Sequence, residues 1–223
     1  MGAVTATQEQ FEKLWSNLAL SPAAECYTTW RGIEANYTDP RRAYHTLDHI
    51  GWGLNRIDEM QSCRDGTNGY GLTLLDWNAI RWAWWFHDYV MNEDSGNEDM
   101  SADEASERAL RGGASVDMCE QVDRLVLATS HGFIPLRIDE AVICDVDLSI
   151  LGAEPRAFDA YERQVRREYQ EVPENLFRSA RHEVMRPFYD RPWVYLTDYA
   201  RNRWEEQAKE NLGRSLARLR DVA

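Results

Sequence analysis

The sequence predicts an all-α fold, and three observations support this prediction. Apolar residues recur at intervals of three and four through most of the chain, which is the spacing of one face of a helix. No segment shows the convincing alternation of apolar and polar residues that a half-buried strand requires. The 223 residues are 43% hydrophobic, which suffices for one core without disulfides. We therefore expect one helical domain spanning residues 1–223.

The expected helices follow one another with legible start and stop signals. The first covers residues 7–20 with Thr7 as N-cap, and the second follows Ser21 and Pro22 and runs to about residue 37. A capping-box pattern at Ser101 predicts a helix that stops at Gly112. The other expected helices cover residues 44–61, 74–90, 115–130, 139–151, 155–171, 173–189 and 197–220. Residues 63–71 and 92–99 are expected loops, rich in glycine and in acidic residues respectively.

Charge and cysteine usage restrict the class of partner. The chain has 25 Lys and Arg against 38 Asp and Glu, a net charge of −13. Nucleic-acid polymers and anionic membranes are excluded as expected partners, because both require clustered Lys and Arg. No run approaches the roughly 20 apolar residues that span a bilayer, and no secretory signal pattern is visible. The scattered cysteines are expected thiols of a cytoplasmic protein: Cys26, Cys63, Cys119 and Cys144.

Two histidines lie four residues apart in the third expected helix. His45 and His49 would therefore share one helix face, different from the apolar face that contains Ile50, Leu54 and Ile57. Such a pair could bind a ligand. It could equally belong to a solvated surface, and the spacing alone leaves both interpretations open.

Acidic residues interrupt two of the most apolar segments. The His87–Asp88 dipeptide ends the tryptophan-rich fourth helix, and Asp145 and Asp147 lie in the apolar run 143–151. A buried carboxylate needs a partner or a metal. The alternatives are a satisfied core histidine for the first motif, and an N-cap or buried ion pair for the second. Together the motifs supply nitrogen and oxygen ligands suited to Mn, Fe, Co, Ni, Zn or Mg.

These motifs, taken together, resemble the HD-domain superfamily of metal-dependent phosphohydrolases, in particular its branch of predicted metal-dependent HD phosphohydrolases. The resemblance extends from about residue 11 to residue 219. It implies a helical metal-site core at about residues 40–152, on which the helices at about 155–220 pack. The segments that carry it are Tyr44-His45-x-x-x-His49-Ile50, Phe86-His87-Asp88, Asp145-Val146-Asp147-Leu148-Ser149, Val165-Arg166-Arg167-Glu168-Tyr169, Arg191-x-x-x-Tyr195-x-Thr197 and Ala208-x-x-Asn211-Leu212.

The resemblance also implies roles for individual residues. Asp147 is preferred to Asp145 because cyclic-nucleotide phosphodiesterases of the superfamily carry the same Asp-Leu-Ser. His45 would protonate the leaving group. Thr46 stands where those enzymes have Asn, so His45 could instead hold the scissile phosphate. The implied ligands of a divalent metal, whose identity the sequence leaves open, are His49, His87, Asp88 and Asp147.

Further candidates come from the resemblance and from charge. His131 could contact a second metal or the substrate phosphate, or could be a helix C-terminal histidine followed by Gly132 as a cap. Glu98 could orient the attacking water, or could be a solvated charge. Arginine suits bidentate phosphate binding, although each candidate could be a surface ion pair. These candidate phosphate-binding residues are Arg166, Arg167, Arg181 and Arg191.

The expected function is that of a cytoplasmic hydrolase that cleaves a phosphoester of a small metabolite, with a nucleotide as leading candidate, by a metal-activated water. The partner is then a small anionic phosphorylated substrate, and the sequence leaves a homodimer open. The alternatives are a diiron oxygenase on the same scaffold and a non-catalytic nucleotide-binding module. His131 is the only histidine between the HD pair and the final Asp, which disfavours the oxygenase, because dinuclear members use two.

Overall fold

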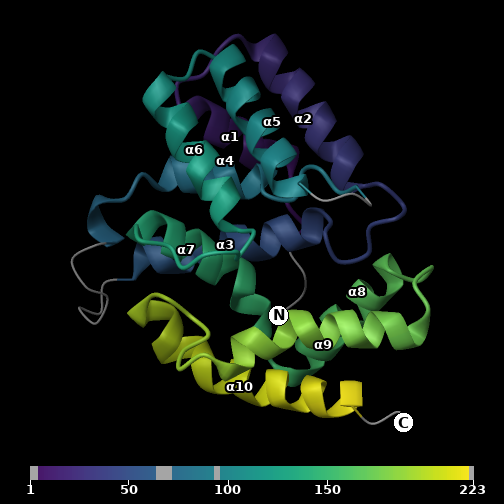
Figure 1. Cartoon of the computed structure of the whole chain (residues 1–223). Coiled ribbons are helices and arrows are strands. Elements are labelled where there is room, and N and C mark those ends of the chain that lie inside the picture. Colours follow the sequence, from purple (N-terminus) through teal and green to yellow (C-terminus); the bar gives the residue numbers. More distant parts are fainter. Residues whose placement is uncertain (1–4, 64–71, 93–95, 221–223) are drawn as a thin grey trace.

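A computed structural model describes residues 5–63, 72–92 and 96–220 of the chain. In these ranges the structure contains ten α-helices, two short 3-10 helices and no strand, which confirms the predicted all-α class (Figure 1). None of the helices described is long and apolar enough to cross a membrane. The elements are α1 (Gln8–Asn17), α2 (Ala23–Tyr37), α3 (Leu47–Ser62), η1 (Leu72–Leu74), α4 (Trp77–Phe86), α5 (Asn97–Arg111), α6 (Val116–Ala128), α7 (Ile138–Asp147), η2 (Leu148–Gly152), α8 (Pro155–Glu168), α9 (Glu174–Asp190) and α10 (Asp198–Arg220).

Helix α4 is the centre of the larger, N-terminal layer. Eight of its ten residues are buried, and α1, α3, α5 and α6 all pack against it. The Asp76 carboxylate caps its start by accepting the N–H groups of Asn78 and Ala79. Phe11 of α1 packs against Trp82 and Trp85 with ring centroids 5.7 and 5.5 Å apart. The buried aromatic contacts therefore fix the position of α4 and of His87, which directly follows it.

Several predicted helix ends are confirmed, and others are wrong for identifiable reasons. Thr7 forms a capping box at α1, and Ser115 caps α6. The third helix begins at residue 47 because the Thr46 hydroxyl accepts the N–H of Asp48. Consequently His45 precedes the helix and shares no helical face with His49, contrary to our expectation.

The fourth and fifth helices also differ from the prediction. Helix α4 ends at Phe86, and the preceding residues 72–74 form a separate 3-10 turn. Helix α5 begins at Asn97, one turn before Ser101, because Gly96 adopts φ +93° and turns the chain early. Ser101 is buried inside α5, where its hydroxyl accepts the N–H of Val90. Much of the two expected loops, residues 64–71 and 93–95, lies outside the described residues.

Helices α8, α9 and α10 form a second layer, which lies below α3 and α7 in Figure 1. Segment η2 connects the layers, since both α8 and α10 pack against it. The Asn211 amide donates to the carbonyls of Leu151 and Ala153, and the Tyr195 hydroxyl donates to the carbonyl of Leu148. These buried hydrogen bonds hold the C-terminal layer against the end of α7. In a separate respect the prediction also holds, since the four cysteines form no disulfide.

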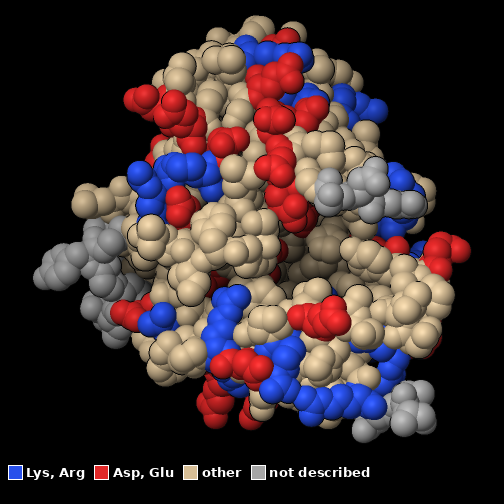
Figure 2. Space-filling view, in the orientation of Figure 1, with Lys and Arg blue, Asp and Glu red and all other residues tan. Residues whose placement is uncertain are grey.

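The surface between the two layers is hollowed (Figure 2). Acidic residues form a stripe above this hollow, over α5, whereas Lys and Arg gather below it on the C-terminal layer. Residues 155–220 contain 14 Arg and Lys against 11 Asp and Glu, although the whole chain is strongly acidic. The positive charge of the chain is therefore concentrated in the C-terminal layer.

Candidate metal centre

Two buried histidines and an aspartate meet from three separate segments. His49 lies in the first turn of α3, His87 directly follows α4, and Asp147 is the last residue of α7. One potential ligand atom from each lies within 4.8 Å of the other two. The Nε2 atoms of His49 and His87 are 3.1 Å apart, and Asp147 Oδ1 is 3.7 Å from each. Burial of His49 excludes the solvated-surface interpretation for this residue.

Asp88 completes this group, which we call the His-Asp cluster (His49, His87, Asp88 and Asp147). Its Oδ2 atom is 2.9 Å from Nε2 of His87 and 3.4 Å from Nε2 of His49. The histidine side chains are 1% exposed, whereas those of Asp88 and Asp147 are 30% and 21% exposed. The structure thus brings together all four implied ligands, closed by imidazoles on one side and open to solvent along the carboxylates.

Hydrogen bonding sets the tautomer of His87. Its Nδ1 atom is 2.8 Å from the carbonyl oxygen of Trp84, which can only accept, so Nδ1 carries a hydrogen. Nε2 therefore faces the carboxylates, and once it gives up its hydrogen its lone pair has the direction that a metal ligand requires. The Nδ1 atom of His49, in contrast, is buried without a hydrogen-bond partner among the described residues.

The electrostatics of the cluster favour a positive charge at its centre. Burial opposes ionisation of Asp88 and Asp147, but the adjacent histidines outweigh burial and hold the pKa of both carboxyls below its usual range. Burial likewise lowers the pKa of His87, but Asp88 and Asp147 outweigh it and raise this pKa to about 10. No Lys or Arg in the described part of the chain forms an ion pair with either carboxylate. Two imidazoles and two carboxylates whose charged partners among the described residues are histidines fit a divalent cation.

Trp84 holds both histidine rings in place. Its ring stacks on His87 at a centroid distance of 4.0 Å and lies 4.9 Å from the ring of His49. The indole N–H donates to the carbonyl of Ile50 at 2.8 Å. Gly53 permits this approach of α3 to α4, because a Cβ atom at that position would lie 2.0 Å from Cζ2 of Trp84. The close packing of α3 on α4 thus fixes Trp84, and Trp84 in turn fixes the two histidine rings.

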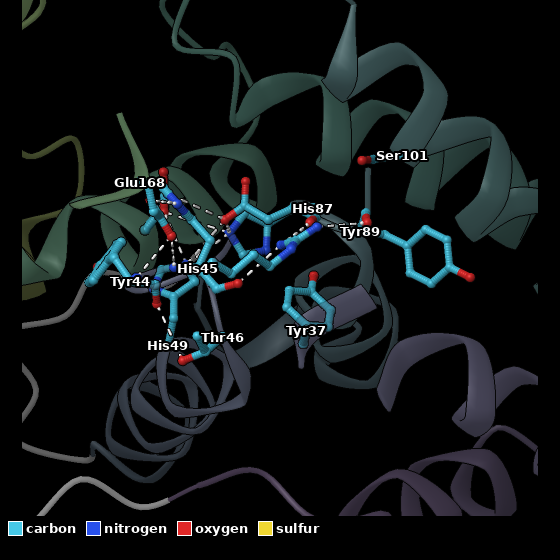
Figure 3. Close-up of polar contacts among 12 residues, drawn as sticks. Tyr37, Tyr44, His45, Thr46, His49, His87, Tyr89, Ser101 and Glu168 are labelled. Carbon is cyan, nitrogen blue, oxygen red and sulfur yellow. Dashed lines mark hydrogen bonds and ion pairs between the residues drawn. The ribbon is translucent and has the colours of Figure 1, made fainter. Parts of the chain in front are cut away.

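His45 lies beside the His-Asp cluster and belongs to the segment before α3. Its Nε2 atom lies 3.9 Å from Oδ2 of Asp88, and its Nδ1 atom lies 2.8 Å from Oε2 of Glu168 (Figure 3). Oε1 of Glu168 accepts the N–H groups of Ala43, Tyr44 and His45 at 2.8–2.9 Å. Burial lowers the pKa of His45, but the carboxylates of Asp88 and Glu168 outweigh burial and raise it.

Glu168 and Arg42 are the residues that sequence reasoning missed. Arg42 is buried and donates to the carbonyls of His45, Asp88 and Tyr89 at 2.8–3.0 Å. Its guanidinium also lies 4.8 Å from the centre of the Tyr37 ring. Glu168 lies within a segment that carries the family resemblance, but nothing in the pattern marks its partners, which are more than 120 residues earlier.

The structure separates Asp145 from Asp147. Asp145 is fully buried, and its two oxygens accept the N–H groups of Leu196 and Thr197 at 2.8 and 2.7 Å. It therefore anchors the segment that precedes α10, a structural role that is neither the N-cap nor the ion pair considered above. Asp147 faces the cluster, and its Oδ2 lies 2.8 Å from Nε2 of His131. His131 adopts φ +54°, so a left-handed backbone turn after α6 directs it to this site.

The candidate arginines mostly bind protein groups. Arg181 donates to Glu162 and to the Tyr161 hydroxyl. Arg166 pairs with Glu174 and donates to the carbonyls of Tyr169 and Val172 in the turn after α8.

The remaining candidates lie outside the His-Asp cluster. The Arg191 guanidinium lies over the Phe188 ring at 4.4 Å. Arg167 is exposed. Glu98 is half-buried in the first turn of α5, where its charge contributes, after burial and other charges, to a raised Tyr169 pKa. None of the four arginines forms an ion pair with a cluster carboxylate among the described residues.

Comparison with known proteins identified no match among family models, curated proteins or solved structures. The resemblance to the HD-domain superfamily therefore stays a prediction from the motifs. What the geometry establishes is the convergence of two imidazoles and two carboxylates from three segments of the chain.

Proposed function

We propose that the chain is a metal-dependent phosphohydrolase that cleaves a phosphoester of a small metabolite, with nucleotides as the first substrate class. The observation that carries the proposal is the convergence of two buried Nε2 atoms with two carboxylates that form no ion pair with any Lys or Arg of the described residues. The residues that would hold a divalent cation are His49, His87, Asp88 and Asp147. When bound, such a cation supplies Lewis-acid stabilisation of a phosphoryl oxygen and lowers the pKa of a water.

The protein's own proton donor in this proposal is His45. Its raised pKa increases the fraction of protonated ring at a given pH, and its Nε2 atom lies on the side of Asp88. A proton held there is available to the departing alkoxide oxygen, which is general acid catalysis. The Trp84 and Tyr44 rings pack against the ring of His49, at centroid distances of 4.9 and 4.7 Å.

Contacts to the phosphoryl oxygens are assigned to histidines in this proposal. His131 lies 2.8 Å from Asp147 at the edge of the cluster, whereas Arg166 and Arg181 are already paired with acidic side chains. We therefore expect His131 and His45, together with the cation, to meet the substrate charge. An arginine clamp is not needed for this arrangement.

A second candidate has one specific observation in its favour. The contact of His131 with Asp147 adds a third histidine next to the cluster, which is a feature of a two-metal site. The diiron oxygenase alternative predicts two tightly bound irons per chain with His131 as a ligand. The hydrolase proposal predicts one cation in the cluster and no dependence of cation uptake on His131.

The test is phosphate release by the purified chain. The protein is incubated with Mn²⁺, Co²⁺, Ni²⁺ or Mg²⁺ and a panel of nucleoside monophosphates, triphosphates and cyclic phosphodiesters. We expect hydrolysis of at least one class, and its loss in His87→Ala/Asp88→Ala. The matched control is His182→Ala/Glu183→Ala, an adjacent histidine–acid pair on α9 outside the cluster, which keeps activity. Absence of hydrolysis with every cation and substrate contradicts the proposal.

A further inference from the structure

The segment that carries His45 lies outside any helix, yet charged side chains hold it from both sides. Glu168, from the last turn of α8, receives the N–H groups of three consecutive residues, 43, 44 and 45. Arg42 donates to the His45 carbonyl and to the backbone after α4. The Glu168 side chain has no exposed surface, so these contacts are buried hydrogen bonds and not a surface ion pair.

Each oxygen of the Glu168 carboxylate has a distinct task. Oε1 binds the three backbone amides, which form a concave anion-binding group. Oε2 is left for the ring of His45, at 2.8 Å from Nδ1. An ionised carboxylate only accepts hydrogen bonds, so this contact places a hydrogen on Nδ1. The other ring nitrogen, Nε2, then faces Asp88 of the His-Asp cluster.

From this geometry we infer that Glu168 is a positioning residue, which sets the tautomer and direction of His45 so that Nε2 serves the leaving group. The role in hydrolysis rests on the function proposed above, whereas the tautomer does not. Glu168 itself touches neither the His-Asp cluster nor, by this inference, the substrate. Its effect on catalysis is exerted through His45 alone, and this restriction makes the inference testable.

Glu168→Gln is the informative variant because it separates the two tasks of the carboxylate. The glutamine carbonyl oxygen can still accept the three backbone amides, so the segment keeps its anchor. The glutamine NH₂ group can only donate, so it forces Nδ1 of His45 to become the acceptor. The ring then carries its hydrogen on Nε2 and loses the carboxylate that favours the protonated form. Glu171→Gln, the same change on an exposed residue three positions later, is the matched control.

The first measurement reads the tautomer and needs no activity. Ring ¹⁵N chemical shifts of His45 are recorded in the full chain loaded with Mg²⁺ or Zn²⁺, with His45→Ala to assign the signals. We expect a protonated Nδ1 in the wild type and in Glu171→Gln, and an unprotonated Nδ1 in Glu168→Gln. An unprotonated Nδ1 in the wild type, or an unchanged tautomer in Glu168→Gln, overturns the inference whatever the protein hydrolyses.

The second measurement separates positioning from a general structural effect. A good leaving group such as p-nitrophenolate needs little protonation, whereas an alkoxide needs much. We expect Glu168→Gln to lower kcat by about 10–100-fold on an alkyl phosphoester and by less than about 3-fold on a p-nitrophenyl ester, with KM nearly unchanged. Equal losses on both substrates, or a rise in KM without loss of kcat, contradict positioning.

The double variant His45→Ala/Glu168→Gln tests whether Glu168 acts only through His45. If Glu168 acts only through His45, the change Glu168→Gln adds no further loss of kcat to His45→Ala. Additive losses show an independent role for Glu168 and overturn the inference. If the wild type hydrolyses neither ester with any cation, the proposed function fails, while the ring-nitrogen measurement still decides whether Glu168 sets the tautomer of His45.

Discussion

At the scale of single residues, Glu168 shows how a buried charge can be stabilised entirely by the contacts it makes. Burial alone would raise its pKa. The hydrogen bond and charge of His45, with the backbone amides of residues 43 and 45, outweigh burial and hold the pKa at about 2, against an ordinary value of 4.5. The ionised form is therefore favoured by folding, and its contribution to stability depends on pH.

The sign of this dependence follows from the lowered pKa. The stabilisation by Glu168 is fully present above about pH 4.5 and is lost as the pH falls toward about 2. We expect Glu168→Gln to lower the free energy of unfolding by on the order of 2–3 kcal/mol at pH 7, and by progressively less below pH 4.5. Urea unfolding at pH 7 and pH 3.5 checks this. A difference between variant and wild type that is the same at both pH values contradicts it.

Single residues also show which parts of the site the sequence could predict. His87, Asp88 and Asp147 stood out because they interrupt apolar segments, and the structure brings them together with His49. Asp145 stood out by the same criterion, but burial alone does not distinguish a ligand from a backbone anchor, and only the position of residues 196–197 reveals its role.

At the scale of elements, helix class was more predictable than helix ends. Periodicity and caps such as Thr7 and Ser115 are local, so the corresponding starts agree with the structure. Thr46 is equally local, but its hydroxyl caps α3 at residue 47, whereas the apolar periodicity predicts a start at residue 44. Glu168 could not be assigned a partner at all, because its contacts join α8 to a segment that belongs to no helix.

The contact between α3 and α4 offers a test of how element packing supports the cluster. We expect Gly53→Ala to destabilise the protein by about 1–3 kcal/mol or more, since its Cβ would lie 2.0 Å from the Trp84 ring that stacks on His87. Gly213→Ala, in α10, is the matched control. Its Cβ meets nothing closer than 3.4 Å, so helix propensity predicts a gain of up to about 1 kcal/mol.

Thermal unfolding and cation uptake measured on both glycine variants check this expectation. We expect Gly53→Ala to weaken cation uptake as well as stability, because displacement of Trp84 moves both histidine rings. A Gly53→Ala variant as stable as the wild type, with unchanged uptake, would show that the close approach of the two helices does not organise the ligands.

At the scale of the whole molecule, the cluster joins parts of the chain that are far apart in sequence. Its ligands lie in the first turn of α3, directly after α4 and at the last residue of α7. His45 links the C-terminal layer to the cluster through its contact with Glu168. A cation bound there would connect these segments in the folded state only.

Cation binding should therefore raise the thermal stability of the chain. A cation at 100 times its Kd contributes about 2.7 kcal/mol, which for a protein of this length raises Tm by roughly 5–10 °C. We expect this increase with Mn²⁺ in differential scanning calorimetry, its reversal by EDTA, and its absence in Asp147→Asn. An equal increase in wild type and variant would indicate cation binding elsewhere on the acidic surface.

The most direct measurement for the central claim is the stoichiometry of cation binding to the His-Asp cluster. Metal-free chain is titrated with Mn²⁺ in a calorimeter, in parallel with His87→Ala and with the control His182→Ala. We expect one high-affinity cation per chain in the wild type and the control, and none in His87→Ala. No high-affinity binding in the wild type, or binding that survives in His87→Ala, would contradict it.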